Sequence, residues 1–418
     1  MSARMLAEAD ALVGLWSCKT ALGGGATFDA ALDLQMTTLD AIVNITIGSS
    51  PQCLTAAYAS PLAIVSHPTS SPGVVCFVES NITTLHSIMQ TIMRGIENVS
   101  SAAFPGLSAR LFLWTSPTWR GAYKTFTQFF IDEIVRARVR EHGKAASSRG
   151  NRLATDADCV LDMLLQREAR EDEEPLSQRE LLDELLSYVF AGQDTTASAL
   201  CWLVKFLALD PKVQYQLHEE VCTIFGQNTG QEAELDYDIL DSAERAPILE
   251  AVVTETLRCA SIVSLTGRER KLSSIYLLRI TYTQATEVLG DEVVLGRRVP
   301  KGTQIMFPIG YMGAMESEWG SDAKLWRPSR WLRSDGSFNR KAGSSVVFGL
   351  GQRSCFGERL AIVQIKVFAA TLSRAFFFKP VPPEISNFDA VQVVTRQPKH
   401  CYVRLEEWPS SSFDQRSK

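Results

Sequence analysis

The sequence predicts a mainly α-helical fold with a small β region, organised as one domain over residues 1–418. Three observations support this fold class. Apolar residues recur at helical spacing in several segments, the longest of these segments starts with a capping box, and strand-and-turn patterns occur mainly after Gly290. No internal repeat divides the chain, so we expect a single core.

Composition and charge exclude several classes of protein. Of the 418 residues, 45% are hydrophobic and 21% are charged, which is typical of a globular protein with a sizeable core. A formal net charge of −5 without a long basic run argues against nucleic acid as a partner. The nine cysteines include no Cys-x-x-Cys pair, so we expect neither a disulfide framework nor a zinc site, and a reducing compartment fits best.

The chain carries no recognisable membrane or export signal. Its N-terminus lacks the basic start, apolar core and cleavage site of a signal peptide. No window offers the roughly 18 uninterrupted apolar residues that a membrane-spanning helix needs. We therefore expect no transmembrane segment and no anchor in this chain.

The part of the chain before residue 177 is predicted to be helical with long connections. Apolar spacing predicts helices at Phe28–Val43 and Tyr123–Val139. Segments rich in Pro, Ser and Gly predict loops at 51–80 and 101–121, and a dense mixture of charges predicts a solvated connection at 141–175.

A long central helix is predicted at about 177–209. Ser177 and Glu180 form the capping box at its start, and Asp210-Pro211 ends it. Roughly 33 residues at 1.5 Å each give about 50 Å, enough to cross a whole domain. Polar residues and a glycine, which costs about 1 kcal/mol relative to alanine, interrupt this apolar helix at residues 191–196. A back-bonded hydroxyl and a local bend would explain the interruption without any function.

The remaining elements are shorter. Helices are predicted at Val213–Phe225, Ile248–Arg258 and Gly357–Ala375, and strands at Val293–Leu295 and Val299–Thr303.

The most informative segment is Phe-Gly-Leu-Gly-Gln-Arg-Ser-Cys-Phe-Gly at residues 348–357. Two glycines before Cys355 allow a tight turn, and the helix that follows would place the sulfur at a helix N-terminus, which favours the thiolate that ligates iron. Arg353 is suited to pair with a haem propionate, and Phe348 would shield the sulfur from water. Gly357 would leave room for the cofactor. A chance match of this pattern has odds on the order of one in ten thousand.

This segment resembles the haem-binding loop of the cytochrome P450 family, Phe-x-x-Gly-x-Arg-x-Cys-x-Gly. The resemblance implies haem b with Cys355 as the axial iron ligand. Two further matches follow the family's order. Glu255-Thr256-Leu257-Arg258 resembles the Glu-x-x-Arg helix, and residues 326–331, Trp-Arg-Pro-Ser-Arg-Trp, resemble the segment that supplies a second arginine, here Arg330. The resemblance implies a buried, structural charge cluster of Glu255, Arg258 and Arg330.

The polar break in the central helix also resembles the family pattern. In the family this stretch opens a groove over the iron, which implies that Thr195 orients dioxygen and water. Asp194 would relay protons from outside, or mainly hold charge and water. Arg268, ten residues after Arg258, resembles a second propionate-binding position and competes with Arg270 for that role.

The chain departs from the family in two places. Cys355 and Thr195 come about a hundred residues earlier than is usual for membrane-anchored members, and no Trp-x-x-x-Arg motif occurs at the expected place, so we expect the front of the fold to be missing. In addition, residues 271–283 form a probable insertion. An added surface strand and a mis-spliced coding segment would both produce it.

Three hypotheses follow from these features. The first is a haem-thiolate monooxygenase that inserts one oxygen atom from O2 into a small lipophilic substrate. The family suggests a secondary metabolite as that substrate, with electrons from NADPH through a flavoprotein reductase. We expect it on the cytosolic side, peripheral to the endoplasmic reticulum membrane. The second is a non-catalytic or haem-deficient fragment, favoured by the missing front. The third, an oxygen-independent isomerase or dehydratase, is disfavoured because that chemistry needs no proton relay.

Overall fold

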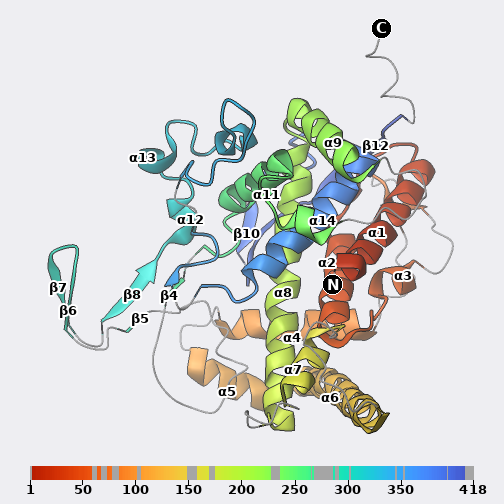
Figure 1. Cartoon of the computed structure of the whole chain (residues 1–418), viewed down its shortest axis with the longest axis vertical. Helices are drawn as coiled ribbons and strands as arrows, with labels where there is room; N and C mark the ends of the chain where they lie inside the picture. The colour runs from red at the N-terminus through yellow and green to blue at the C-terminus, as the bar shows by residue number, and fades with distance from the viewer. Residues whose placement is uncertain are drawn as a thin grey trace.

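The computed structural model describes residues 2–58, 64–66, 73–77, 84–100, 105–147, 158–168, 175–226, 236–264, 266–267, 286–287, 291–300, 303–343, 346–351, 354–392 and 394–409. Helices dominate these residues, and the strands form small sheets at the periphery (Figure 1). The mainly α fold class is therefore confirmed. The predicted insertion at 271–283 lies outside the described residues.

The central helix α8, Gln178–Leu207, runs through the middle of the molecule (Figure 1). Its first turn carries the capping box: Ser177 Oγ accepts the Glu180 N–H at 3.2 Å, and Glu180 Oε2 accepts the Ser177 N–H at 2.8 Å. The glycine in its middle serves packing, because a Cβ on Gly192 would lie 2.7 Å from Cδ1 of Ile42 in α2, Ala31–Ile47. Gly192 thus lets two helices approach closely.

Other helices surround α8. Helices α2, α6, α11 and α14 pack most extensively against it, and α7 and α9 also contact it. Their apolar faces merge into one large core cluster. The helices not yet given bounds are α1 (Ser2–Leu22), α3 (Cys53–Ala57), α4 (Thr84–Ser100), α5 (Pro105–Thr115), α6 (Pro117–Ser147), α7 (Val160–Glu168), α9 (Pro211–Phe225), α10 (Tyr237–Leu240), α11 (Pro247–Ala260), α12 (Ile309–Met312), α13 (Glu316–Trp319), the 3-10 helix η3 (Pro328–Trp331) and α14 (Glu358–Ala375).

Within the described residues, the strands form five small sheets, ordered β1-β12-β9, β10-β11, β2-β3, β4-β8-β5 and β6-β7. The pairs are antiparallel, and the β6-β7 hairpin extends away from the helical body (Figure 1). The strand bounds are β1 (Phe28–Asp29), β2 (Ile64–Ser66), β3 (Cys76–Phe77), β4 (Thr266–Gly267), β5 (Thr286–Glu287), β6 (Glu292–Val294), β7 (Arg297–Val299), β8 (Gln304–Phe307), β9 (Phe376–Lys379), β10 (Ala390–Gln392), β11 (Arg396–Pro398) and β12 (Tyr402–Glu407).

Three predicted connections are wrong. The predicted loop at 51–80 contains α3, β2 and β3 among its described residues. The predicted loop at 101–121 contains α5 and the start of α6, each of which begins with a proline, Pro105 and Pro117. A proline at the first helical position loses no hydrogen bond, so these prolines start helices instead of breaking them. The predicted connection at 141–175 contains the end of α6 and all of α7. Helix α7 forms because Leu161 and Leu165 are buried in the core.

Candidate functional site

Cys355 lies in a tight turn at the entrance to α14. Its backbone N–H donates to the carbonyl oxygen of Phe348 at 2.7 Å, which closes the turn. Gly349 and Gly351 have φ angles of 75° and 70°, a backbone conformation that favours glycine. Both glycines before the cysteine therefore supply the geometry that the turn requires.

The environment of the sulfur is only partly as expected. Cys355 is exposed, and the N–H of Gly357 donates to its sulfur, which lowers the thiol pKa. Removal of water by the surrounding loop has a larger and opposite effect, and the charge of Glu358 adds to it, so the pKa of the thiol is raised above its ordinary value. The Gly357 N–H thus acts in the direction that the sequence predicted, but loss of hydration has the larger effect on the thiol pKa. A bound cation would favour the thiolate.

The surroundings of Cys355 fit a flat apolar group that carries a metal. Phe356 and Leu350 are 85% and 69% exposed although both are large and apolar. The ring of Tyr188 in α8 lies 5.6 Å from that of Phe356. Tyr188, Ala191 and Thr195 share the least buried stripe of α8, so this open stripe approaches the cysteine loop. A thiol among exposed apolar side chains, opposite an open helix face, is suited to haem.

The two residues of the polar break point in different directions. Thr195 is half-buried, and its hydroxyl donates to the Ala191 carbonyl oxygen at 2.7 Å, while its lone pairs can still accept. Asp194 is buried and lies against the strand region near β11, where one carboxyl oxygen lies 2.7 Å from Thr395 Oγ1 and the other accepts from Gln397 Nε2 at 2.9 Å. Burial is the largest influence on the Asp194 carboxyl and raises its pKa.

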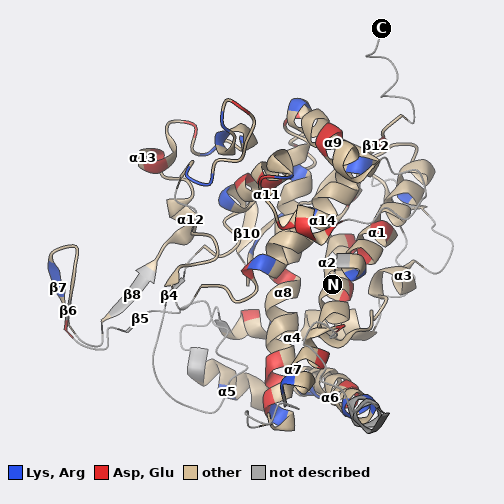
Figure 2. Ribbon diagram, in the orientation of Figure 1, with Lys and Arg blue, Asp and Glu red and all other residues tan. Residues whose placement is uncertain are grey.

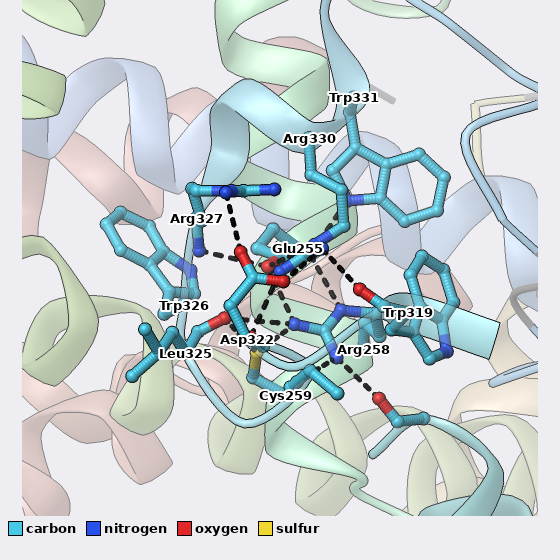
Figure 3. A network of polar contacts seen from close by, with 12 residues as sticks. Glu255, Arg258, Cys259, Trp319, Asp322, Leu325, Trp326, Arg327, Arg330 and Trp331 are labelled. Carbon is cyan, nitrogen blue, oxygen red and sulfur yellow. Dashed lines mark hydrogen bonds and ion pairs between the residues drawn. The ribbon is translucent and has the colours of Figure 1, made fainter. Parts of the chain in front are cut away.

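The three residues predicted to form a charge cluster do lie together (Figure 3). Glu255 is fully buried in α11, and its two oxygens accept from Arg258 Nη2 at 2.7 Å and Nε at 2.8 Å. Arg330 Nε approaches the same carboxylate at 3.4 Å. Burial opposes the charge on Arg258, but the hydrogen bonds and charge of Glu255 outweigh it and raise the Arg258 pKa.

The segment after α13 completes this cluster. The backbone N–H of Arg327 and the indole N–H of Trp331 donate to Glu255 at 2.9 Å and 2.8 Å, and Arg330 also binds Asp322 at 3.1 Å (Figure 3). Arg258 Nη1 donates to the Ala323 carbonyl oxygen at 2.6 Å. The cluster therefore fixes the 319–331 segment against α11. Its geometry matches a structural role, because all its contacts are internal.

Sequence reasoning missed several partners of these residues. The Asp322 carboxylate and the Trp331 indole belong to the Glu255 cluster, and Thr395 and Gln397 hold Asp194. Trp331 follows Arg330 directly in the same motif, so the sequence could have predicted it as a member of the cluster. No local pattern links Asp194 to residues two hundred positions later. Arg353 and Arg268, the predicted propionate partners, lie outside the described residues.

Comparison with known proteins decides the family. The sequence profile described as Cytochrome P450 matches residues 1–404. The chain belongs to the cytochrome P450 family. Its fold agrees: the crystal structure of cytochrome P450DA heme domain superposes with a TM-score of 0.68 over 97% of this chain and 72% of that chain, at 18% sequence identity.

Fungal cytochrome P450 monooxygenases are among the relatives of this cytochrome P450. One from Pestalotiopsis microspora is 28% identical, over 95% of this chain and 71% of the relative. The monooxygenase xilC of Penicillium crustosum is 26% identical, over 94% of this chain and 69% of the relative. A monooxygenase of Dothistroma septosporum named for the Hps1-dma1 cluster is 28% identical, over 68% of this chain and 96% of the relative. Family membership thus supports haem as the cofactor and oxidoreductase chemistry of the monooxygenase type.

Proposed function

We propose that this cytochrome P450 is a haem-thiolate monooxygenase that inserts one oxygen atom from O2 into a small lipophilic substrate, with secondary metabolites as the substrate class. The observation that carries the proposal is the Cys355 turn, which the contact between the rings of Phe356 and Tyr188 brings to the open stripe of α8. Haem b held by the Cys355 thiolate would supply the site of dioxygen reduction, and the thiolate would favour O–O cleavage. The fungal relatives, one of them named for a gene cluster, support the substrate class.

The residues of this chain would divide the remaining work. Cys355 would bind the iron, and Phe348 and Gly357 would shape the turn beneath the cofactor. Arg353 and Arg268 are proposed to bind the propionates by charge-assisted hydrogen bonds. On the opposite side, Thr195 would orient dioxygen and water, and Asp194 would deliver protons.

We propose that electrons come from NADPH through a flavoprotein reductase. The supporting observation is a surface cavity of about 360 Å³ beside Cys355, lined in part by Phe356, Arg340 and Arg359. Both arginine side chains are well exposed, although each also pairs with a carboxylate, Glu244 or Asp241. Three carboxylates and Lys366 line the same cavity, so its charges balance, and the exposed Phe356 ring is the feature that supports a docking partner.

Thr195→Ala tests the proposed oxygen-handling role. The hydroxyl would contact oxygen and water, so haem content and substrate binding should stay close to wild type while product per NADPH falls and hydrogen peroxide rises. The measurement compares NADPH consumption, peroxide and product in haem-loaded protein.

Ser187→Ala is the matched control for this experiment. The Ser187 hydroxyl is also back-bonded within α8, donating to the Asp183 carbonyl oxygen at 2.7 Å. Its removal should leave coupling unchanged, because it lies two turns before Thr195. If Thr195→Ala behaved like Ser187→Ala, the hydroxyl of Thr195 would serve helix geometry alone.

We also propose that the protein associates peripherally with the endoplasmic reticulum membrane. Among the described residues, no helix is both long and apolar enough to cross a bilayer. Helix α5, however, exposes Leu107, Leu111 and Trp114 by 61%, 53% and 78%, and their spacing puts them on one face. Residues 98–131 contain no Asp or Glu but three basic residues, and Figure 2 shows few charges on α5. An apolar face with basic surroundings suits an anionic lipid surface.

Leu111→Ser combined with Trp114→Ser tests this association. The double variant should bind phosphatidylcholine vesicles that contain phosphatidylserine at least tenfold more weakly in cosedimentation, because it loses the two side chains best placed to enter the bilayer. Leu209→Ser removes another exposed leucine, 55% exposed at the end of α8, and should bind like wild type. Equal binding by all three proteins would reject α5 as the contact.

A further inference from the structure

Asp194 is held by residues that the family motif does not include. Its side chain is 8% exposed. Thr395 Oγ1 lies 2.7 Å from Asp194 Oδ2, and Gln397 Nε2 donates to Oδ1 at 2.9 Å. Both carboxyl oxygens are thus engaged by side chains at the start of β11, away from the stripe that carries Thr195.

The contacts continue into a closed chain of oxygens. Thr395 Oγ1 lies 2.6 Å from Ser198 Oγ, and Ser198 Oγ lies 2.7 Å from the backbone carbonyl oxygen of Asp194. Thr395 and Ser198 are each 1% exposed. The chain therefore runs from the Asp194 carboxyl through two buried hydroxyls back to the Asp194 backbone, with three links between four oxygens.

The number of hydrogens available shows which protonation state of Asp194 this chain of hydrogen-bonded oxygens favours. Each link between two oxygens needs one hydrogen, and each hydroxyl supplies one. Thr395 and Ser198 together supply two hydrogens for three links. The third is present only if Asp194 is protonated: Asp194 then donates to Thr395, Thr395 to Ser198, and Ser198 to the backbone carbonyl. With a carboxylate, two buried oxygens about 2.7 Å apart would face each other without a hydrogen, which is costly.

The amide of Gln397 fits the same arrangement. Its Nε2 lies 2.9 Å from Asp194 Oδ1 and 3.2 Å from Thr395 Oγ1, so its two hydrogens serve the two acceptors that the protonated chain leaves open. In this state Thr395 Oγ1 accepts twice and donates once, which uses its full hydrogen-bonding capacity. Gln397 therefore orients the acid without competing for its proton.

The charges around Asp194 agree with a neutral acid. Within the described part of the chain, the charged side chain that acts on Asp194 is Glu97 of α4, which raises the Asp194 pKa, as burial does more strongly. The Thr395 and Gln397 hydrogen bonds act in the opposite direction. Arg396 lies between them in sequence, but its guanidinium stacks on Trp202 at 4.7 Å and donates to the Ala260 carbonyl oxygen at 2.6 Å. An ionised Asp194 would lack a cationic partner there.

We propose that Asp194 rests as a neutral carboxylic acid at neutral pH, and that Ser198, Thr395 and Gln397 are positioning residues that keep it protonated for the proton-donating role proposed above. The role of this acid as a proton donor rests on the proposed monooxygenase function, whereas its protonation state rests on the contacts described above. When the acid gives up its proton, the Thr395 hydroxyl turns to donate to the carboxylate and one of the links to Ser198 opens. A proton returning from solvent restores the chain, so the cycle needs no other reactant.

Infrared spectroscopy tests the resting state directly and without turnover. The infrared spectrum of the wild-type protein, after subtraction of the spectrum of Asp194→Asn, should show a carboxylic-acid C=O band at neutral pH. This band should shift in heavy water. Titration from about pH 5 to about pH 9 gives its midpoint. Ser198→Ala removes the link that demands a third hydrogen, so the midpoint should fall by about one pH unit, a tenfold change in the ratio of acid to carboxylate. Absence of the wild-type band at neutral pH would overturn the proposal.

Two further variants separate the chain from general packing. Ser198→Thr keeps the hydroxyl and should restore the wild-type midpoint, whereas Ser187→Ala removes an α8 hydroxyl outside the chain and should not move it. If Ser198→Ala titrated like wild type, Ser198 would have no positioning role. The infrared result is independent of the Thr195→Ala coupling experiment. If Thr195→Ala left coupling unchanged, the proposed oxygen-handling role of Thr195 would be rejected. The protonation state of Asp194 would still be determined by its infrared band.

Discussion

Cys355→Ser is expected to abolish the long-wavelength Soret band of the ferrous carbon monoxide complex. That band depends on a thiolate ligand, and a serine hydroxyl does not supply the same electron density to the iron. The measurement is the difference spectrum of reduced, carbon monoxide-treated protein after reconstitution with haem. We expect complete loss, because the described turn offers one sulfur beside the open stripe of α8.

The control for this prediction is Cys18→Ser. Cys18 is also exposed, but it lies in α1, far along the chain from the haem-loop motif, so its removal should leave the band unchanged. A band that survived Cys355→Ser would mean that another residue is the ligand. Failure of the wild-type chain to retain haem would instead support the haem-deficient fragment.

The parts of the fold that were predictable have local causes. The start of α8 is set by hydrogen bonds within four residues, Ser177 to Glu180, and the Cys355 turn is set by glycines next to the cysteine. Helix α5 and the start of α6 were missed for an equally local reason, since a proline can start a helix as readily as it can end one. Composition alone did not distinguish these two uses.

The parts of the site that were not predictable depend on distant residues. Asp194 meets Thr395 across 201 positions of sequence, and no spacing rule identifies such a partner. The glycine at 192 looked like part of the polar break, but its cause is Ile42 on another helix. The raised Cys355 pKa likewise reflects loss of hydration of the thiol in the folded loop, which outweighs the helix N-terminus on which the sequence argument depended. Motifs therefore predicted the candidate residues, while tertiary contacts shift the pKa values of Cys355 and Asp194.

Glu255→Ala is expected to lower the free energy of unfolding by about 3–5 kcal/mol, because removing one partner of a buried ion pair leaves the other charge uncompensated. Arg258 and Arg330 would both lose this partner, and their side chains are 1% and 7% exposed. The Arg327 N–H and the Trp331 indole would also lose an acceptor. Because a typical domain is stable by about 5–15 kcal/mol, the midpoint of urea unfolding should fall sharply or the protein should not accumulate.

Glu244→Ala separates this effect from the general loss of an acidic side chain. Glu244 pairs with Arg340 at 3.3 Å, but both side chains are about two-thirds exposed, at 70% and 67%, so water replaces the lost contact. The urea midpoint of Glu244→Ala should match that of wild type. Glu255→Gln should lie between the two alanine variants, because an amide can still accept from Arg258 and Trp331 but lacks the negative charge that compensates two buried guanidinium groups. If Glu255→Ala unfolded at the wild-type urea concentration, the cluster would not be what fixes the 319–331 segment to α11.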